Sequence, residues 1–267
     1  MRILLIGRTG QVGGELERVL GEAVATDRGA LDLLDETAIR ETMRQRKPQI
    51  VINAAAYTAV DRAESERETA MRVNGIAPGI LGEEARRLGA LLVHYSTDYV
   101  FDGEKATAYV EDDQARPLSA YGASKLEGEN RIRAAGCRHL ILRTSWVYGP
   151  RGRNFYLTMK AKAGEPLRVV DDQKGVPTSS RFLAEHTVSL INKDIEGLLH
   201  LVPSGSTTWY GFARAILGEE SAIAPIGSSE YLTAARRPAN SVLDNRKAQA
   251  LLGHALPDWR SVLAALT

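Results

Sequence analysis

The chain has 267 residues, with 34 Lys and Arg against 33 Asp and Glu. Hydrophobic residues at 44% and charged residues at 25% are ordinary for a globular protein with a buried core, and they exclude a disordered chain. The formal net charge of +1 gives no electrostatic reason to expect nucleic acid or an anionic membrane as a partner. The single cysteine, Cys137, excludes an internal disulfide framework and a Cys-rich zinc site.

The apolar segments of the chain are short. None reaches the roughly 18 residues that a membrane-spanning helix needs. The apolar run Ile3–Ile6 near the N-terminus is also too short for a signal peptide. We therefore expect a cytoplasmic protein whose function lies in a small-molecule site.

In the first half, short apolar runs alternate with helical patterns. Strands are predicted at Ile3–Ile6, Ala23–Thr26, Ile50–Ile52, Leu91–Tyr95 and His139–Leu142, and helices at Gln11–Leu20, Thr37–Arg46 and Ala120–Ala134. The Ala-rich stretch Val60–Leu88 is expected to form two helices with a break near Asn74–Gly79. Strands that alternate with helices predict a parallel sheet covered on both faces, in a Rossmann-like, doubly wound α/β fold.

After about Tyr148 the alternation becomes irregular. We expect helices at Asn154–Ala163, Ser180–Ile191, Trp209–Leu217, Asp244–Leu252 and Asp258–Leu266, and a strand at Leu198–Leu201. This pattern predicts a dinucleotide-binding domain over residues 1–150. Residues 151–267 are expected to form mainly a smaller substrate-binding lobe, with some elements returning to the sheet.

A glycine-rich loop, Gly7-Arg8-Thr9-Gly10-Gln11-Val12-Gly13, lies between the first predicted strand and helix. Glycines at Gly7, Gly10 and Gly13 allow a tight turn, the approach of a pyrophosphate to the backbone, and close packing of helix on sheet. The helix N-terminus adds N–H groups and a partial positive charge. We interpret the loop as a dinucleotide site. It is not an ATP phosphate loop, because no Gly-Lys-Ser/Thr follows.

The end of the second predicted strand carries Asp27 and Arg28. A carboxylate there accepts from ribose hydroxyls and favours NADH, whereas an arginine neutralises the 2′-phosphate of NADPH. Both residues are present, so cofactor preference stays open, and a solvated charged turn is the alternative. Asp32 and Leu33 are further candidates for contact with the adenine.

Two copies of Tyr-x-x-x-Lys occur, at Tyr121/Lys125 and Tyr156/Lys160. The spacing puts a phenol and an ammonium on one helix face, where the positive charge helps a phenol of pKa near 10 to exchange protons. Thr97, within Ser96-Thr97-Asp98 at the end of a predicted strand, selects the first pair, because its hydroxyl can converge with Tyr121 on one carbonyl oxygen. The second pair is predicted to be a surface helix face.

Metal and covalent chemistry have no support in the sequence. None of the five histidines has the spacing of a metal ligand, and His94 is predicted to be a buried core residue within a strand. The chain contains no Gly-x-Ser-x-Gly elbow, and Cys137 has no neighbouring base.

Taken together, these motifs resemble those of dTDP-4-dehydrorhamnose reductases, a family of the extended short-chain dehydrogenase/reductase superfamily. The resemblance spans nearly the full chain. The similar segments are Gly7–Gly14, Val51–Asp61, His94–Phe101, Tyr121–Glu129, Arg143–Tyr148, Asp172-Gln173, Gly175–Thr178, His200–Val202, Arg237-Pro238 and Asn240-Ser241. The most specific of them are Ser-Thr-Asp-Tyr-Val-Phe and Arg-Thr-Ser-Trp-Val-Tyr.

This resemblance implies NADPH- or NADH-dependent reduction of the C4 keto group of dTDP-4-dehydro-L-rhamnose, the last step of dTDP-rhamnose synthesis. It implies that Tyr121 is the general acid, that Lys125 lowers its pKa and orients the nicotinamide ribose, and that Thr97 hydrogen-bonds the carbonyl. Implied cofactor contacts are Gly10, Gln11, Val12, Asp27, Asp32, Leu33, Ala56, Tyr57, Thr58 and Tyr95, besides Tyr121 and Lys125. Implied substrate contacts are Thr97, Asp98, Trp146 and Arg237, the last as a pyrophosphate clamp.

Several alternatives stay open at this point. Another sugar-nucleotide reductase, an epimerase or a dehydratase would use the same Tyr/Lys pair, although a dehydratase would carry a glutamate after Thr97-Asp98. A regulatory subunit that binds the dinucleotide without turnover is a third hypothesis. A homodimer and a Mg²⁺ requirement are undecided: Glu15 matches a position that some family members use for magnesium, but we interpret it as a surface glutamate and assign no metal ligand.

Overall fold

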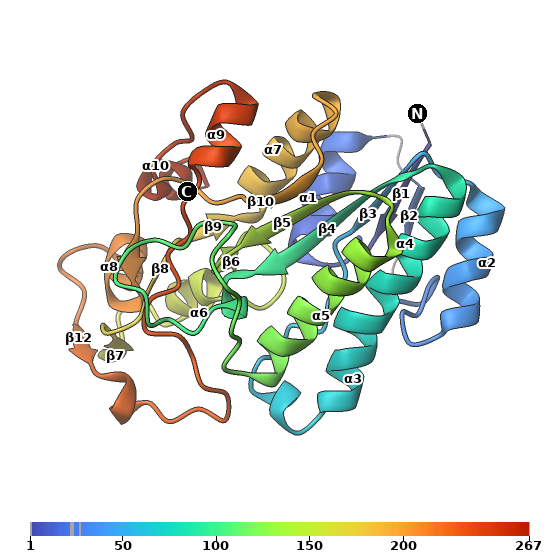
Figure 1. Ribbon diagram of the computed structural model, residues 1–267. Coiled ribbons are helices and arrows are strands. Elements are labelled where there is room, and N and C mark those ends of the chain that lie inside the picture. The colour runs from blue at the N-terminus through green and yellow to red at the C-terminus, as the bar shows by residue number, and fades with distance from the viewer. Residues whose placement is uncertain (1, 22–23, 27, 267) are drawn as a thin grey trace.

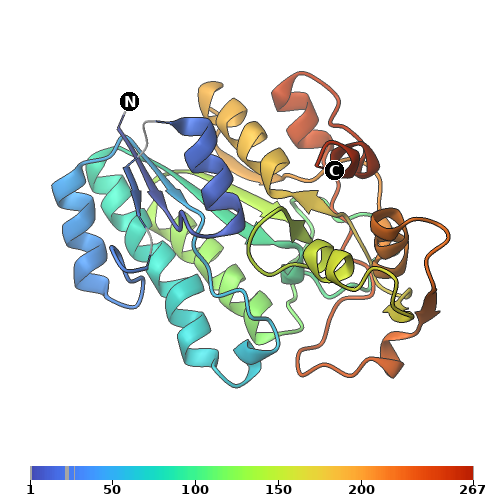
Figure 2. The ribbon, with the colours of Figure 1, turned by 180° about the vertical axis from the view of Figure 1, so that it is seen from behind.

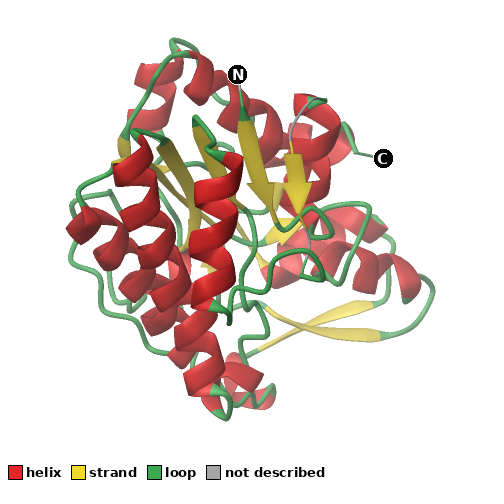
Figure 3. Ribbon diagram, turned by 90° about the vertical axis from the view of Figure 1, so that its right-hand side faces the viewer, coloured by secondary structure: helices red, strands yellow, loops and turns green. Residues whose placement is uncertain are grey.

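The fold is organised around one parallel sheet. The computed structural model describes residues 2–21, 24–26 and 28–266. Among these, six parallel strands pair in the order β10-β5-β4-β3-β1-β2. Their bounds are β1 Ile3–Ile6, β2 Val24–Thr26, β3 Ile50–Asn53, β4 Leu91–Thr97, β5 Arg138–Thr144 and β10 Gly197–His200. The sheet lies between helices on either side (Figures 1 and 3), so the predicted doubly wound α/β fold is confirmed.

Both faces of the sheet are buried because its strands are almost continuously apolar. One face packs against α2 (Glu36–Arg46), α4 (Ala77–Leu88) and α5 (Ala120–Ala135). The other face packs against α1 (Gln11–Leu20) and α7 (Ser180–Asn192), which lie side by side in front of the strands in Figure 2. Side chains alternate between the two layers, so Leu4 contributes to one core and Leu5 to the other.

The predicted break near Asn74–Gly79 is wrong. After a 3₁₀ turn (Arg62–Glu64), α3 (Arg67–Met71) continues into a π-helical turn (Arg72–Ile76) and then into α4 without interruption. Pro78 removes one N–H from this continuous helix, and it does so directly after the π-helical turn, where the regular helical bonding pattern is already altered. The small residues that suggest a break serve a close approach to α5 instead: a Cβ on Gly79 would lie 2.9 Å from Arg131 Cβ, and one on Gly75 would lie 3.1 Å from Glu127 Cγ.

The second half adds one strand to the sheet and a group of short elements beside it. Helices α6 (Phe155–Ala161) and α8 (Trp209–Leu217) pack together, and α10 (Trp259–Ala264) joins them where Trp259 meets Phe212 of α8. Helix α9 (Arg246–Leu252) instead packs against α7 and β10, and lies beside α7 in Figure 1. Small two-stranded sheets join β6 (Val147–Tyr148) to β9 (Thr178–Ser179), β8 (Lys174–Gly175) to β11 (Thr207–Thr208), and β7 (Leu167–Val170) to β12 (Ile223–Ile226). Such short strands escaped the sequence analysis because they are too short to show a period. The boundary near residue 150 stays a prediction.

No helix within the described ranges combines the length and apolar character that crossing a bilayer would require.

A buried ion pair ties α5 to the sheet. The Arg143 guanidinium on β5 donates to both oxygens of Glu129 on α5, at 2.9 and 2.8 Å, and both side chains are almost fully buried. Ser96 of β4 donates to the same carboxylate at 2.6 Å. Because Lys125 lies one turn before Glu129, this contact also sets where Lys125 stands relative to the end of β4.

We predict that Arg143→Met lowers the free energy of unfolding by about 3 kcal/mol, since it leaves the Glu129 carboxylate buried beside an apolar side chain. Arg131→Met is the matched control: its pair with Glu127 on the same helix is exposed and contributes about 0.5 kcal/mol or less. Urea unfolding measures both. Equal losses in the two variants would contradict the importance of the buried pair.

Candidate active site

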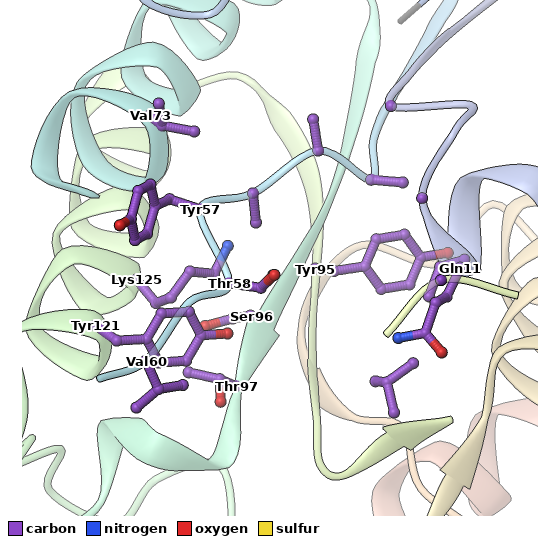
Figure 4. A pocket seen from close by; sticks show the side chains of 18 of the residues that line it. Gln11, Tyr57, Thr58, Val60, Val73, Tyr95, Ser96, Thr97, Tyr121 and Lys125 are labelled. Carbon is purple, nitrogen blue, oxygen red and sulfur yellow. The ribbon is translucent and has the colours of Figure 1, made fainter. Parts of the chain in front are cut away.

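A cavity of about 940 Å³ lies where β1, β3 and β4 end. The strand order reverses between β1 and β3, so the chain leaves these strands toward opposite faces and opens a crevice. Figure 4 shows Tyr121, Lys125 and Thr97 grouped at one side of it, and Gln11 and Tyr95 at the other. The predicted residues on its wall are Gly7, Gly10, Gln11, Val12, Arg28, Asp32, Leu33, Ala56, Tyr57, Thr58, Tyr95, Thr97, Asp98, Tyr121, Lys125 and Trp146.

Three of the predicted site residues are not among the described residues that line this cavity. Asp27 lies outside the described residues. Gly13 lies behind the loop, where a Cβ would stand 2.0 Å from the Gly7 carbonyl oxygen, so its role is to let α1 pack closely. Arg237 binds Asp61 instead, at 2.9 Å.

The glycine loop forms a cradle for a phosphate group. Gly7 has φ +91°, and a Cβ there would lie 2.7 Å from the Ala55 nitrogen, so only glycine fits. Gly10 caps α1 without a side-chain bond, and the first turn of that helix holds no acidic residue. The first N–H groups of α1 therefore have no competing side-chain acceptor among the described residues, which fits a pyrophosphate at the helix N-terminus.

The cavity wall also includes Arg28 and Asp32. The Arg28 side chain is 80% exposed, and its Nε lies 3.9 Å from the Asp32 carboxylate. Asp32 also accepts from the Leu34 nitrogen at 3.0 Å, which fixes its loop, while Leu33 is buried beside it. Among the described residues, the Arg28 guanidinium makes only this one long contact with Asp32. It can therefore turn toward an anionic group of a ligand.

The loop after β3 is fixed by Asn74, which the sequence analysis missed. Its side-chain oxygen accepts from the Tyr57 nitrogen at 2.8 Å, and its amide nitrogen donates to the Tyr57 carbonyl at 3.0 Å and to Ser124 Oγ at 3.0 Å. Asn74 lies in the π-helical turn, which points its side chain at the loop. The available signal was an asparagine inside the Ala-rich helical pattern, and the structure buries its side chain, which must then find hydrogen-bond partners.

Thr97 and Tyr121 meet at the end of β4. Thr97 accepts from the Tyr99 nitrogen at 3.2 Å and donates to Asp98 Oδ1 at 3.0 Å, so its hydroxyl is oriented. Burial raises the pKa of Tyr121 to about 12, while its hydrogen bond with Thr97 acts in the opposite direction. The net shift is upward, opposite to the lowering by Lys125 that the family resemblance implies. Tyr121 therefore holds its proton at neutral pH, as a general acid requires.

Lys125 is fully buried one turn after Tyr121. Burial lowers its pKa to about 8, although the Glu129 carboxylate acts in the opposite direction. Its Nζ lies 3.1 Å from His94 Nε2. His94 is buried, as the sequence analysis predicted, but it is also a direct neighbour of the candidate catalytic lysine.

Asp98 places a second ionisable group beside Thr97. Burial raises the pKa of this carboxyl group to about 7, while hydrogen bonds from Ser241 and Thr97 act against the shift. Its Oδ2 is buried and has no hydrogen-bond partner among the described residues. A carboxyl oxygen in this state is suited to a polar group of a ligand, because an unpaired buried acceptor is costly.

Two indoles form part of the wall. Trp146 and Trp209 stack with ring centroids 3.6 Å apart and planes at 8°, and both line the cavity. On the Trp146 ring, Gly175 approaches so closely that a Cβ would lie 2.4 Å from Cε2. The Trp146 backbone has φ +45°, an unusual value for a bulky residue that aims the ring into this slot. Trp209 was missed because its spacing connects it to no motif.

Two predictions about polar residues are wrong. Tyr156 is only 4% exposed and packs with Tyr148 in an aromatic cluster, because α6 lies against α8. Lys160 is exposed as predicted, and its Nζ donates to the Tyr156 hydroxyl at 3.3 Å, away from the cavity. Glu15 is buried, not a surface residue, since α1 packs on α7, and it pairs with Arg18 at 3.1 Å.

Within residues 2–21, 24–26 and 28–266, no group of three or more His, Cys, Asp or Glu side chains could hold a metal ion.

Comparison with known proteins identifies the family. The model of the family described as "RmlD substrate binding domain" matches residues 1–267. The chain is 44% identical to the dTDP-4-dehydrorhamnose reductase of Burkholderia thailandensis, covering 97% of this chain and 96% of the relative. The chain belongs to the dTDP-4-dehydrorhamnose reductase family.

Further similarities agree with this assignment. The dTDP-4-dehydrorhamnose reductase of Escherichia coli K12 is 42% identical, over 97% of this chain and 95% of that protein. The crystal structure of the dTDP-4-dehydrorhamnose reductase from Bacillus anthracis in complex with NADP superposes with a TM-score of 0.94, at 32% identity. That superposition covers 99% of this chain and 98% of the other.

The pKa of Asp98 yields a stability prediction. Its folded-state pKa of about 7 lies above the ordinary 3.8, so the folded protein binds more protons than the unfolded chain between these values. Ionising this carboxyl group therefore costs stability as the pH rises from about 4 to about 7. Asp98→Asn should be more stable than wild type by about 2 kcal/mol at about pH 8, and the difference should vanish near about pH 4. Urea unfolding at several pH values measures it; a pH-independent difference would contradict the assignment.

Proposed function

We propose that this chain reduces the C4 keto group of dTDP-4-dehydro-L-rhamnose to dTDP-L-rhamnose, with NADPH or NADH as the electron donor. The observation that carries the proposal is the convergence of Thr97, Tyr121 and Lys125 on one cavity whose other end is the glycine loop. Membership of a family whose named members are dTDP-4-dehydrorhamnose reductases supports the substrate. The NADP bound in the related Bacillus anthracis structure supports the cofactor class.

Different residues of this chain would bind different parts of the cofactor. The N-terminus of α1 at Gly10 and Gln11 would hold the pyrophosphate, and Arg28, Asp32 and Leu33 the adenosine. The loop at Ala56, Tyr57 and Thr58, together with Tyr95, would line the path toward the nicotinamide. The dinucleotide, when bound, supplies a hydride to the carbonyl carbon. Asn74 keeps this loop in place through its two bonds to the Tyr57 backbone.

Tyr121 supplies the proton. Its raised pKa keeps the hydroxyl protonated at neutral pH, so it can donate to the carbonyl oxygen as negative charge develops there. Thr97 would add a second hydrogen bond to the same oxygen by turning its single proton from Asp98 Oδ1 toward the ligand. Lys125, when charged, stabilises the tyrosinate left behind and holds the ribose hydroxyls. Burial of this group excludes water and strengthens each of these electrostatic contacts.

On the sugar-nucleotide side, we propose that Trp146 bounds the sugar ring and that Asp98 Oδ2 accepts from a sugar hydroxyl. Arg237 is proposed as the clamp for the substrate pyrophosphate, since a guanidinium matches phosphate geometry. Its ion pair with Asp61 places the guanidinium beside the segment that contributes Val60 and Arg62 to the cavity wall.

A dehydratase is disfavoured because Tyr99, not a glutamate, follows Thr97-Asp98. A cytoplasmic location and the lack of nucleic-acid and membrane partners stay predictions, and a homodimer and Mg²⁺ stay open.

We predict that Tyr121→Phe lowers kcat by about 10³-fold, the range that a general acid contributes, while the Kd for NADPH changes less than about threefold, since the ring is retained. Tyr156→Phe in the second Tyr-x-x-x-Lys copy is the matched control and should keep kcat within about twofold. NADPH oxidation is followed by its near-ultraviolet absorbance, and binding by its fluorescence. Wild-type turnover in Tyr121→Phe would overturn the assignment of the acid.

Arg28 tests the choice of cofactor. Arg28→Ala should raise KM for NADPH about tenfold, equivalent to about 1.4 kcal/mol, by removing a charge from the adenosine end of the cavity. KM for NADH should change little, because NADH has no 2′-phosphate. Steady-state kinetics with each cofactor decide the matter, and equal effects on both KM values would show that Arg28 does not face the 2′-position.

A further inference from the structure

A chain of hydrogen-bonding groups runs beneath the candidate catalytic lysine, outside the cavity wall. His94 is fully buried on the face of β4 that packs toward α4 and α5. Its Nε2 lies 3.1 Å from Lys125 Nζ, and its Nδ1 lies 3.2 Å from the side-chain nitrogen of Asn53 on β3. Neither His94 nor Asn53 lines the cavity that the structure describes, so any effect of the pair on a ligand must pass through Lys125.

The orientation of Asn53 is fixed by its own loop. Its Oδ1 accepts from the Ala55 nitrogen at 3.2 Å, which turns the amide nitrogen toward the ring of His94. An amide nitrogen only donates, so this contact requires a bare Nδ1 on the imidazole. In a neutral ring the proton is then on Nε2, the atom that faces Lys125. The imidazole is held neutral, since burial and then the charge of Lys125 lower the pKa of His94 well below its ordinary value.

An N–H on Nε2 has a consequence for the amine. A neutral amine can accept that proton, whereas an ammonium has only donors and cannot. With Lys125 neutral, both hydrogen bonds of His94 are satisfied. With Lys125 charged, the ring must carry its proton on Nδ1 to accept from the ammonium, and the bond with Asn53 is then lost. The tautomer of His94 and the charge of Lys125 are therefore coupled.

We propose that His94, oriented by Asn53, is a positioning residue of the reductase site that couples the charge of Lys125 to the tautomer of the buried imidazole. This inference rests on the proposed function, because it assigns His94 a role only through the lysine that serves Tyr121. Beside His94, Lys125 can be either an amine or an ammonium. The hydrogen bond from Asn53 to Nδ1 of His94 favours the amine form.

The other groups around this chain are few. On α5, Tyr121 lies one turn before Lys125, and Glu129 one turn after it. Glu129 is itself bound to Arg143 of β5, and Arg133 of α5 lies 3.6 Å from the same carboxylate. Asn53 on β3 and Asn74 in the π-helical turn, which donates to Ser124 of α5, are uncharged. Glu129 favours the ammonium form of Lys125. Its position stays the same in both states of Lys125, because Arg143 donates to both of its oxygens.

The tautomer can be observed directly in the wild-type protein, without substrate. Selective ¹⁵N labelling of histidine and NMR of the ring nitrogens, assigned with His94→Gln, should show the proton on Nε2 above the pKa of Lys125. It should move to Nδ1 as the pH falls from about 10 to about 6. In Lys125→Met the proton should stay on Nε2 throughout. A single tautomer of His94, unaffected by pH or by Lys125→Met, would overturn the coupling even if the enzyme is fully active.

Catalysis gives the second measurement. His94→Gln offers an amide oxygen that accepts from the ammonium, so the alkaline limb of the kcat–pH profile should shift upward by about one pH unit. KM for the sugar nucleotide should stay within about twofold, because His94 does not line the cavity. His254→Gln, an exposed histidine, is the matched control and should leave the profile unchanged. An unshifted profile in a folded, active His94→Gln enzyme would overturn the proposal, and an NMR switch without reductase activity would instead count against the proposed function alone.

Discussion

The contact between α5 and the edge of β4 and β5 is the constraint on which the site depends. Glu129 takes three hydrogen bonds, from Arg143 and Ser96, in a place where water cannot replace them. This fixes the rotation and height of α5 against the sheet. Lys125 and Tyr121, one and two turns before Glu129, are thereby brought to the carboxyl end of β4, where Thr97 lies. A polar contact buried this deeply specifies position, because any displacement would leave a charge unpaired.

The same burial determines the protonation states of the site. It raises the pKa values of Tyr121 and Asp98 and lowers that of Lys125, so each group is shifted toward its neutral form. Because these groups are neutral before a ligand binds, the site carries little charge of its own until the ligand brings charge into it. The phosphates of a dinucleotide, in contrast, meet a partial positive charge that the backbone of α1 supplies and that titration cannot remove.

Much of this arrangement could be predicted from local sequence. The strands of the sheet and the helices on both faces follow from continuous apolar runs and helical spacing, and the glycine loop, Thr97 and the Tyr121/Lys125 pair follow from strand ends. What could not be predicted depends on contacts between distant segments. Trp209 reaches the cavity only because α8 packs beside Trp146, and Tyr156 is buried for a similar reason. Two-residue strands and the π-helical turn at Asn74 carry no period, so no pattern reveals them.

The central claim is that hydride reaches C4 of the sugar in this cavity. The most direct test uses NADPH that carries deuterium at the transferred position of the nicotinamide, incubated with the enzyme and dTDP-4-dehydro-L-rhamnose. We expect one deuterium on C4 of the dTDP-L-rhamnose formed, with one oxidised cofactor for each product molecule. A sugar product without the label, or consumption of the keto sugar with no oxidation of the cofactor, would contradict it.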